Sequence, residues 1–528
     1  MQAGADNQEK HPQVWTMCPP GPTVICRYGN FLIMTFLAFY FFLVPFGLLL
    51  NWLSDPGLKG SADVPRFAYG LHRRLSQRYE KWAKQRIGSP MAGQLSADQV
   101  AATEWPAFGS VFYLWATESL QQAWEKDRTI YRVAPNVYAA GAIEAAAALV
   151  ADPCNAAWVR RHWGENYLHR ENVFYRMLLI GGLTSYHKLL AGDKYLDLIR
   201  DQVETLSKEL DESPYGLLDD YPGQCYPTDV VAAIAAIRRA DGILGTDHSA
   251  FVERAIRGFE GKLVDETGLP PYSANPHSGV IDISRGCSNQ WMTVWAPEIW
   301  PDRAKRWYDS FQEHFWQHRY GAVGFREFPR DYSAFNWYLD VDSGPVVVGF
   351  GAAACGFGVG AARANNRFDH AWPLGAEVLV MSWPLPDGTL FSARLLSNTA
   401  NAKYLGETAL LYSFTRTPVS IAVISRGGML PAFVYYGLGA YLAGGGLLLA
   451  AGLWMLQWWR GRIVLRPAPL GWMQVVVWAA IVIAGFATCF SGNPVWTLLL
   501  LLAAQLLPRG EKSWPKKAKH FIPDSLGV

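Results

Sequence analysis

Carboxylates and tyrosines gather in the segment 216–229, which reads GLLDDYPGQCYPTD. Asp229 stands just before an apolar run typical of a helix, and a helix N-terminus stabilises a carboxylate by about 0.3–1 kcal/mol. We therefore expect Asp229 to stay ionised and to act as a base. Asp219 or Asp220, close to Tyr221 and Tyr226, is expected to have a raised pKa and to act as an acid. In a purely structural alternative, Pro-Thr-Asp is an ordinary helix start and Asp229 only caps the helix.

A second group of reactive side chains follows in the loops around residues 275–290. His277 lies in the turn Asn-Pro-His-Ser-Gly and is a candidate acid–base residue. Arg285 precedes another apolar helix, where it either binds an anionic group or pairs with Asp282. Cys287 is a nucleophile only if a neighbouring charge lowers its thiol pKa, and is otherwise a structural thiol.

Asp340 and Asp342 precede Ser343, where a further helix is predicted. One of the two carboxylates is expected to cap that helix and the other to face a pocket. Aromatic residues cluster near these inferred loop ends, where they either contact a sugar or a terpenoid chain or belong to the core. They are Trp115, Trp291, Trp295, Phe335, Trp337 and Tyr338.

Helical periodicity, interrupted by short stretches of Pro, Gly and Asp, dominates residues 67–383. Small, apolar segments alternate with longer, charged ones, which is the pattern expected of an inner and an outer ring of helices. The region is therefore predicted to be all-α, with five or six helix pairs closing into an (α/α)6 barrel whose funnel is lined by the loops before the inner helices. An open solenoid is the alternative. The predicted helices are 67–87, 108–126, 136–151, 171–190, 195–210, 229–239, 248–264, 288–299, 303–319, 343–365 and 371–383.

Apolar segments flank this helical region on both sides. Residues 31–53 carry no charge and are long enough to cross a hydrocarbon core of about 30 Å, with Pro45 as a possible kink. This run is too long for the h-region of a cleaved signal peptide, which has about 7–15 residues. Residues 430–459 and 470–490 are further predicted spans. Residues 494–507 are shorter than the usual span of about 20 residues, so they either cross a thin bilayer or stay re-entrant.

Basic residues predict the orientation of these spans, because cytoplasmic loops are enriched in Lys and Arg. Arg460, Arg462 and Arg466 follow the second span, and a basic tail that includes Arg509 and Lys512 follows the fourth. The expected order is a cytoplasmic segment 1–30, a span 31–53, an extracytoplasmic domain 54–428, three membrane segments in 429–508 and a cytoplasmic tail 509–528. In a Gram-negative bacterium the domain would lie in the periplasm and the spans in the inner membrane.

Composition agrees with a chain made of membrane spans and one large folded domain. Only 17% of its 528 residues are charged and 50% are hydrophobic, against about 25% charged in a soluble protein. This excludes a disordered chain and a small disulfide scaffold. The net charge of +2 gives no reason to expect a nucleic-acid partner. The chain has no phosphate-binding loop, dinucleotide fingerprint or zinc-ligand spacing, so we expect no cofactor and no metal.

Several short motifs follow one another along the folded region. They are Glu171-Asn-x-x-Tyr175, Leu189-x-x-Gly192-x-x-Tyr195, Pro214-Tyr-Gly-Leu217, Asp241-Gly-Ile-Leu-Gly-Thr-Asp247, Tyr272-Ser-x-x-Pro276-x-Ser-Gly279, Arg326-Glu327 and Asp340-Val-Asp-Ser-Gly344. In their order and spacing these motifs resemble the linalool dehydratase/isomerase family over roughly residues 108–418. The resemblance implies an extracytoplasmic (α/α)6 barrel. It also implies cofactor-free acid–base chemistry on a monoterpene alcohol in a hydrophobic pocket.

The family's functional side chains are mostly replaced in this sequence. Its acid–base Asp aligns with Gly109, its two tyrosines with Trp115 and Asn136, and its His with Leu178. Its two cysteines align with Asp229 and with Asp219 or Asp220, so thiols have become carboxylates. Arg326 and Glu327 match the family and are expected to form an ion pair. The residues expected to contact substrate are Trp115, Asn136, Tyr226, Arg285, Cys287, Trp291, Asp340 and Asp342.

Three functions fit these residues. The first is a membrane-tethered lyase or isomerase that acts on a hydrophobic alcohol or a lipid-linked substrate, as the family resemblance implies. The second is a glycan-active hydrolase, lyase or epimerase with paired Asp residues, since such barrels with aromatic funnels also act on carbohydrates. The third is a non-catalytic binding module of an envelope complex.

Overall fold

The computed structural model describes residues 22–61, 63–95, 99–332, 336–399, 401–419, 427, 429–458 and 468–507. The molecule is mostly helical, with 67% of its residues in helices. The chain divides into two compact units, one of residues 1–42 with 443–528 and the other of residues 43–442. The predicted basic clusters around Arg460 and Arg509 lie outside the described residues.

Three helices are long and apolar enough to cross a membrane: Arg27–Leu53, Ala432–Leu456 and Met473–Phe490. Within the described residues they match three of the four predicted spans. The fourth predicted span contains the helix α22 (Pro494–Ala504), whose 11 residues extend only about 17 Å at 1.5 Å per residue. It packs against α21 (Ala468–Phe490), so this part of the chain is helical but too short for an ordinary span.

The first span consists of α1 (Pro22–Ala38), a π-helical turn (Phe39–Leu43) and α2 (Val44–Leu53). Pro45 explains the wide turn, because it has no N–H to donate to the carbonyl of Phe41, one turn earlier. The expected disturbance at Pro45 is therefore present, in the form of a π-helical turn next to it. The second long apolar helix, Ala432–Leu456, is part of α20 (Ala432–Trp458).

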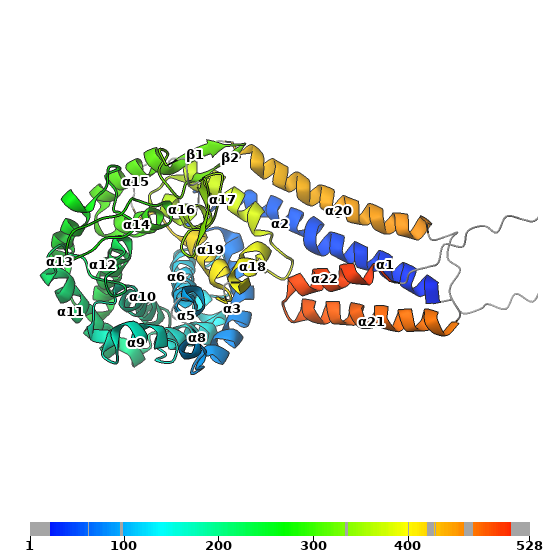
Figure 1. Cartoon of the computed structure of the whole chain (residues 1–528), viewed down its shortest axis with the longest axis horizontal. Helices are drawn as coiled ribbons and strands as arrows, with labels where there is room; N and C mark the ends of the chain where they lie inside the picture. The colour runs from blue at the N-terminus through cyan, green and yellow to red at the C-terminus, as the bar shows by residue number, and fades with distance from the viewer. Residues whose placement is uncertain are drawn as a thin grey trace, which may run out of the picture. The chain divides into compact units, whose positions relative to one another are not determined.

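In the larger unit, one set of helices packs in a continuous succession (Figure 1). Each helix contacts the next along the chain, and α19 packs in turn against α6. These helices are mostly buried, and α10 and α12 have few exposed residues. We call this set the inner helices; it consists of α6 (Trp105–Lys126), α10 (Val173–Leu190), α12 (Pro227–Leu244), α14 (Gly286–Ile299), α16 (Ala352–Ala364) and α19 (Leu405–Thr415).

A second set of helices packs against this succession from the side (Figure 1). In α11 and α15 apolar residues recur at helical spacing between charged ones, so one face is buried and the other is solvated. The set consists of α3 (Arg66–Arg86), α8 (Ala140–Val150), α11 (Leu196–Glu212), α13 (Ser249–Ala255), α15 (Pro301–Phe315) and α17 (Phe368–Ser382). Shorter helices are α4 (Met91–Gln94), α5 (Val100–Thr103), α7 (Pro135–Tyr138), α9 (Ala157–Trp163) and α18 (Phe391–Thr399), with 3-10 turns at Tyr167–His169, Asp193–Tyr195, Ile256–Phe259 and Gly261–Leu263.

Five short strands correct the expectation of an all-α domain. They form two antiparallel sheets, β1–β2 and β3–β4–β5. The helix predicted over 343–365 begins only at Ala352, because Gly344 and Gly349 adopt φ of +61° and +88° and Pro345 lacks an N–H. The strands are β1 (Trp316–Arg319), β2 (Ala322–Phe325), β3 (Trp337–Asp340), β4 (Gly344–Val347) and β5 (Phe350–Gly351).

Arg363 connects α16 to two distant loops of the larger unit. Its side chain is buried, and its guanidinium donates to the backbone oxygens of Gly57 (2.9 Å), Asp63 (2.7 Å) and Arg416 (2.8 Å). These bonds hold the segment between α2 and α3, and the end of α19, against α16. Burial lowers the pKa of Arg363 to about 10, so the side chain still carries its charge at neutral pH.

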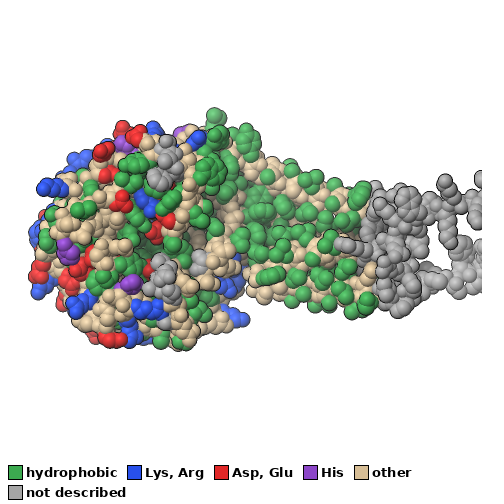
Figure 2. Space-filling view, viewed as in Figure 1, with side chains coloured by type: hydrophobic (Ala, Val, Ile, Leu, Met, Phe, Trp, Pro, Cys, Tyr) green, Lys and Arg blue, Asp and Glu red, His purple; other side chains and the backbone are tan. Residues whose placement is uncertain are grey.

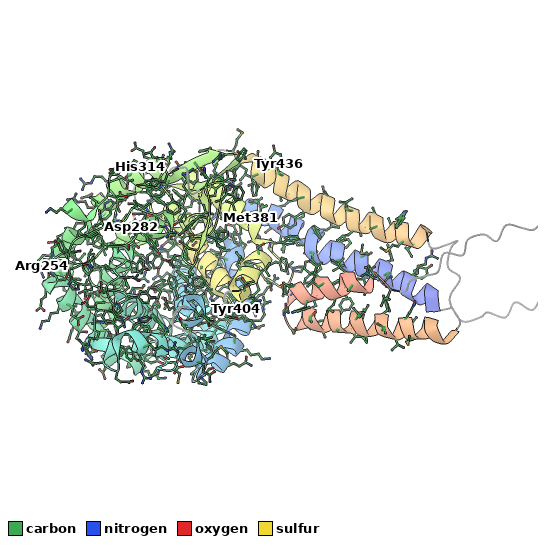
Figure 3. The ribbon with its side chains drawn as sticks, viewed as in Figure 1. Arg254, Asp282, His314, Met381, Tyr404 and Tyr436 are labelled. Carbon is green, nitrogen blue, oxygen red and sulfur yellow. The ribbon has the colours of Figure 1, made fainter. Side chains whose placement is uncertain are left out.

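Replacing Arg363 with Met should lower the free energy of unfolding by about 3 kcal/mol or more, because three buried carbonyl groups lose their donor. Thermal unfolding of the purified chain measures the change. Arg254→Met is the control, since Arg254 is half exposed and pairs with Asp211 at the surface (Figure 3), where an ion pair contributes about 0–1 kcal/mol. Equal losses in the two variants would contradict the role given to Arg363.

Candidate active site

Four carboxylic acids come together at the N-terminal ends of the inner helices. Glu104 precedes α6, Asp229 lies in the first turn of α12, and Asp342 lies in the turn between β3 and β4. Asp220 belongs to the loop before α12. The charges of these carboxylates raise one another's pKa values, which requires the four groups to lie close together. We call Glu104, Asp220, Asp229 and Asp342 the acid cluster.

Glu104 is buried, and the sequence analysis missed it. Burial raises its pKa to about 8; a hydrogen bond with Tyr221 partly opposes this, while the charges of Asp342 and Asp229 add to it. Glu104 is therefore protonated at neutral pH and suited to donate a proton. A signal existed in the sequence: an acidic residue directly before Trp105-Pro106 marks a helix start, because Pro favours the first helical turn.

Asp229 does not have the low pKa expected at a helix N-terminus. Burial raises its pKa to about 7, the charge of Asp342 adds to this, and the Trp291 indole opposes it. The expectation of a permanently ionised base is wrong, since desolvation outweighs the modest effect of the helix dipole. Asp229 is also not the capping residue, because that position belongs to Tyr226 and has no side-chain cap.

Asp219 and Asp220 are neighbours in sequence but have different surroundings. Asp220 is buried and accepts a hydrogen bond from the backbone N–H of Tyr226 (2.7 Å). Burial and the charge of Asp229 raise the pKa of Asp220 well above its usual value. Asp219 accepts a hydrogen bond from the N–H of Gly223 (2.6 Å) and lies near Glu171 and His277 instead. Asp220 is thus the member of the pair that joins the acid cluster.

Tyrosines surround the acid cluster. The Tyr272 hydroxyl donates a hydrogen bond to Asp342, and the rings of Tyr226 and Tyr272 lie 5.3 Å apart. Asp342 is an exposed residue, yet the surrounding protein desolvates its carboxyl group enough to raise its pKa. The predicted contact residues Tyr226 and Asp342 therefore lie in the same site, and solvent reaches it at Asp342.

Arg285 does not serve as a free anion-binding residue. Its guanidinium pairs with Glu327 (2.8 Å) and Asp340 (2.6 Å) and lies over the Tyr272 ring. The proposed partner Asp282 is thus replaced by two other carboxylates. Asp340 also accepts a hydrogen bond from the N–H of Ser343 (2.7 Å). Although burial opposes it, this bond and the charge of Arg285 lower the pKa of Asp340.

One further expectation about this region is wrong, and for Cys287 the structure favours the alternative of a structural thiol. Arg326 does not pair with Glu327; it donates to the carbonyl of Phe328 (3.1 Å) and to Gln317 (2.9 Å). Cys287 lies beside Glu327, and burial together with that carboxylate raises its thiol pKa well above the usual value. The thiol is therefore protonated and is not an activated nucleophile.

Aromatic rings fill the space deeper along the inner helices. Trp115 lies 4.7 Å from Trp295 and 5.9 Å from Trp291 between ring centroids. The indole N–H groups of Trp115 and Trp295 are buried and lack a hydrogen-bond partner among the described residues. Trp291 belongs to this layer and also acts on Asp229, so the layer begins where the acid cluster ends. We call this layer the aromatic floor; it consists of Phe112, Trp115, Trp291, Trp295, Phe357 and Tyr412.

At the C-terminal ends of the inner helices, buried carboxylates are paired with Arg and Lys side chains. Glu118, near the C-terminal end of α6, is buried but pairs with Arg239 (2.6 Å) and Lys188 (3.2 Å). Although burial would raise it, these cations lower the pKa of Glu118 to about 2. Glu298 pairs with Arg416 (2.6 Å) at the same end. The acids of the acid cluster have no such cation in hydrogen-bond contact among the described residues.

Two predicted site residues lie away from the acid cluster. The backbone N–H of Asn136 bonds to Gln121 and its side chain to the carbonyl of Leu189, so it lies at the C-terminal ends of α6 and α10. It therefore belongs to the end opposite the acid cluster. His277 is exposed in a turn held by the Asn275 side chain, which accepts from the N–H of His277 (3.0 Å).

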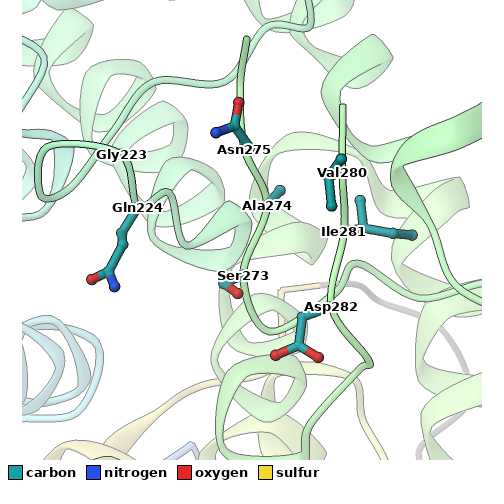
Figure 4. Close-up of a pocket in the computed structure, with 8 residues that line it drawn as sticks. All are labelled: Gly223, Gln224, Ser273, Ala274, Asn275, Val280, Ile281 and Asp282. Carbon is teal, nitrogen blue, oxygen red and sulfur yellow. The ribbon is translucent and has the colours of Figure 1, made fainter. Parts of the chain in front are cut away.

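Loops before α12 and α14 enclose a rim pocket of about 330 Å³ (Figure 4). Cys225 and Ala274 join the two loops by backbone hydrogen bonds of 3.2 and 2.9 Å. The space-filling view shows this face of the larger unit hollowed, with acidic and hydrophobic side chains around the hollow (Figure 2). The pocket is lined by Gly223, Gln224, Ser273, Ala274, Asn275, Val280, Ile281 and Asp282.

Comparisons with known proteins give no family for this chain. No protein-family model matches it, and no curated protein is similar enough to match. The resemblance to linalool dehydratase/isomerase therefore remains a prediction from motifs. What the site can do chemically follows from its geometry: protonatable acids, surrounded by tyrosines, stand above a layer of aromatic rings.

Stability should fall as the pH rises from about 4.5 to 8. Over this range the folded chain holds protons on Glu104 and Asp229 that the unfolded chain has released, so unfolding becomes easier by up to about 1.4 kcal/mol per pH unit for each group. Glu104→Gln should flatten the dependence of melting temperature on pH. Glu125→Gln, an exposed change on α6, should keep the wild-type slope. A slope unchanged by Glu104→Gln would argue against a raised pKa.

Gly286 lets the start of α14 approach the segment after β2 that contains Glu327. Its N–H donates to the Glu327 carbonyl (2.7 Å), and a Cβ atom at this position would lie 2.0 Å from the Arg326 carbonyl oxygen. Gly286→Ala should therefore displace Arg285 and Cys287 and cost about 1–3 kcal/mol in unfolding experiments. Gly242→Ala, on α12 with no atom within 4 Å, should instead stabilise by about 0.5–1 kcal/mol.

Proposed function

We propose that residues 43–442 form an (α/α)6 barrel of the linalool dehydratase/isomerase type. Two observations support this. The inner helices follow one another from α6 to α19, and α19 packs back on α6, which is how a closed barrel is connected. The acid cluster also lies in the loops and first turns before inner helices, where the funnel of such a barrel is expected.

The proposed activity is acid–base elimination or isomerisation of a hydrophobic alcohol without a cofactor. The observation that carries it is the pair of acids with pKa values raised to about 8 and 7, the buried Glu104 and the partly buried Asp229, above the aromatic floor. At neutral pH the first is protonated and the second is partly ionised, so the site holds an acid and a base together.

In this reaction the Glu104 carboxyl donates its proton to the substrate hydroxyl, and the carbon–oxygen bond breaks with release of water. The Asp229 carboxylate takes a proton from the neighbouring carbon, whose electrons form the new double bond. Glu104 ends ionised and Asp229 protonated, and proton exchange with solvent through the open side at Asp342 resets both. The aromatic floor suits an apolar chain, and its ring faces favour a carbon centre that becomes positive.

We also propose that the chain is anchored in a membrane, with this domain outside the cytoplasm. Three long apolar helices support the anchoring. The basic residues of the sequence after the second and fourth apolar segments support the orientation, by the enrichment of Lys and Arg on the cytoplasmic side. A membrane anchor suits a substrate that is itself hydrophobic or lipid-linked.

A glycan substrate is the second candidate. It is favoured by Trp337, which is 71% exposed on the hairpin whose turn contains Asp342, because an exposed indole can stack on a sugar ring. The partly exposed Tyr226 and Tyr272 add to such a surface. The reaction would again use paired carboxylic acids.

The decisive experiment compares turnover of tertiary terpene alcohols and of envelope glycans by the purified full-length chain. Glu104→Gln and Asp229→Asn should each lower kcat at least about 100-fold, since each removes one proton-transfer group. The pH profile of the wild type should peak between about pH 7 and 8, where Glu104 is still protonated and Asp229 is ionised.

The matched control is Glu125→Gln, at the other end of α6, which should keep wild-type turnover. Turnover of glycans alone, with the same two variants inactive, would favour the second candidate. No turnover of any substrate would reject both enzymes and leave a binding module.

A further inference from the structure

Glu171, Asp219 and His277 lie together although they are far apart in the sequence. Each offers one ligand atom, and the three atoms lie within 4.8 Å of one another. Glu171 precedes α10, Asp219 lies in the loop before α12, and His277 lies in the loop before α14. Among the described residues this is the only such group of His, Cys, Asp and Glu. Two carboxylates and an imidazole are a ligand set that suits Zn²⁺.

Asp219 supplies an independent reason to expect a cation. The residue is only 4% exposed, and its Oδ1 is buried without a hydrogen-bond partner among the described residues. Its Oδ2 is already used by the N–H of Gly223 (2.6 Å). A buried carboxylate oxygen without a donor or a cation is costly, and a metal ion at Oδ1 would remove that cost.

The neighbouring groups are arranged so that ligand atoms remain free. Glu171 Oε2 accepts the backbone N–H of Asp219 (2.7 Å), which fixes the two carboxylates relative to each other and leaves Glu171 Oε1 for another partner. His277 is exposed, and its turn is held through its backbone by Asn275, so the imidazole ring is not needed for that turn.

A cavity of about 400 Å³ gives access to this group. Glu171 and His277 belong to its lining, together with Glu209, Glu212 and Arg170, and Glu209 is paired with Arg176 (2.7 Å). His169 also lines the cavity, but it pairs with Asp201 (3.2 Å) and lies outside the three-residue group. Water from the cavity can complete the coordination of an ion held by three protein ligands.

We propose that Glu171, Asp219 and His277 bind one Zn²⁺ ion at the rim of the larger unit. The ion connects the segment before α10 with the loops before α12 and α14. Because Asp219 is followed directly by Asp220, the ion also fixes the loop from which Asp220 reaches the acid cluster. The sequence analysis expected no metal, since the three residues have no short spacing that marks a zinc site.

The test uses the full-length chain, freed of metal with a chelator and titrated with ZnCl₂ by calorimetry. We expect one ion per chain with a Kd in the micromolar range or below, and a melting temperature that rises with Zn²⁺. His277→Ala should weaken binding at least tenfold and remove the thermal shift. Co²⁺ in place of Zn²⁺ should give a visible absorption band that is lost in the same variant.

His169→Ala is the matched control, because it removes an exposed imidazole from the same cavity without touching the proposed ligands. It should bind Zn²⁺ as the wild type does. His277→Ala should keep its melting temperature in the absence of metal, since the residue is exposed. Binding that is only millimolar, that exceeds one ion per chain, or that survives His277→Ala would overturn the proposal, and so would a Mn²⁺ or Ca²⁺ preference over Zn²⁺.

Discussion

Desolvation of carboxylic acids without matching cations is the constraint on which the larger unit depends. At the C-terminal ends of the inner helices, Glu118 and Glu298 are buried with Arg239, Lys188 and Arg416. At the N-terminal ends, Glu104 and Asp220 are buried, Asp229 is partly buried and Asp342 is exposed, and tyrosines and tryptophans surround these acids instead of cations. The same residue type is thus held ionised at one end and protonatable at the other.

This asymmetry runs against the helix dipoles at one end only. Cations near helix C-termini are favourable, and the basic residues around Glu118 and Glu298 occupy such positions. At the N-termini the dipoles favour ionised carboxylates, yet burial raises the pKa of Asp229 to about 7. The packing around the acid cluster therefore raises the pKa of Asp229 although the helix dipole favours its ionised form. Such raised pKa values are common where a protein holds reactive groups.

Arg285 lies near the acid cluster, but other carboxylates engage its charge. Arg285 is buried and divided between Glu327 and Asp340, and its guanidinium lies over the ring of Tyr272. Burial raises the pKa of Glu327 to about 7, although Arg285 opposes this. If Arg285 were free to turn towards Asp342 or Glu104, it would lower their pKa values and remove the acid. Its two carboxylate partners keep it in place.

Local patterns in the sequence predicted most helices of this unit, because apolar residues at helical spacing and Pro or Gly boundaries are local signals. The predictions failed where the signal is short. The inner helix α19 was missed because Leu405–Thr415 has little amphipathic periodicity, and β4 and β5 were taken for the start of the helix predicted over 343–365. The site was predicted in part: Asp229, Tyr226, Asp342 and Trp291 come together, whereas Asn136 lies at the other end.

A local sequence pattern does not show in which direction the side chains of adjacent loop residues point. The sequence left Asp219 and Asp220 as alternatives for one role. In the structure one carboxylate lies near Asp229 and the other near Glu171 and His277. A single loop carries both carboxylates. The group of Glu171, Asp219 and His277 and the acid cluster are therefore joined through the backbone between Asp219 and Asp220.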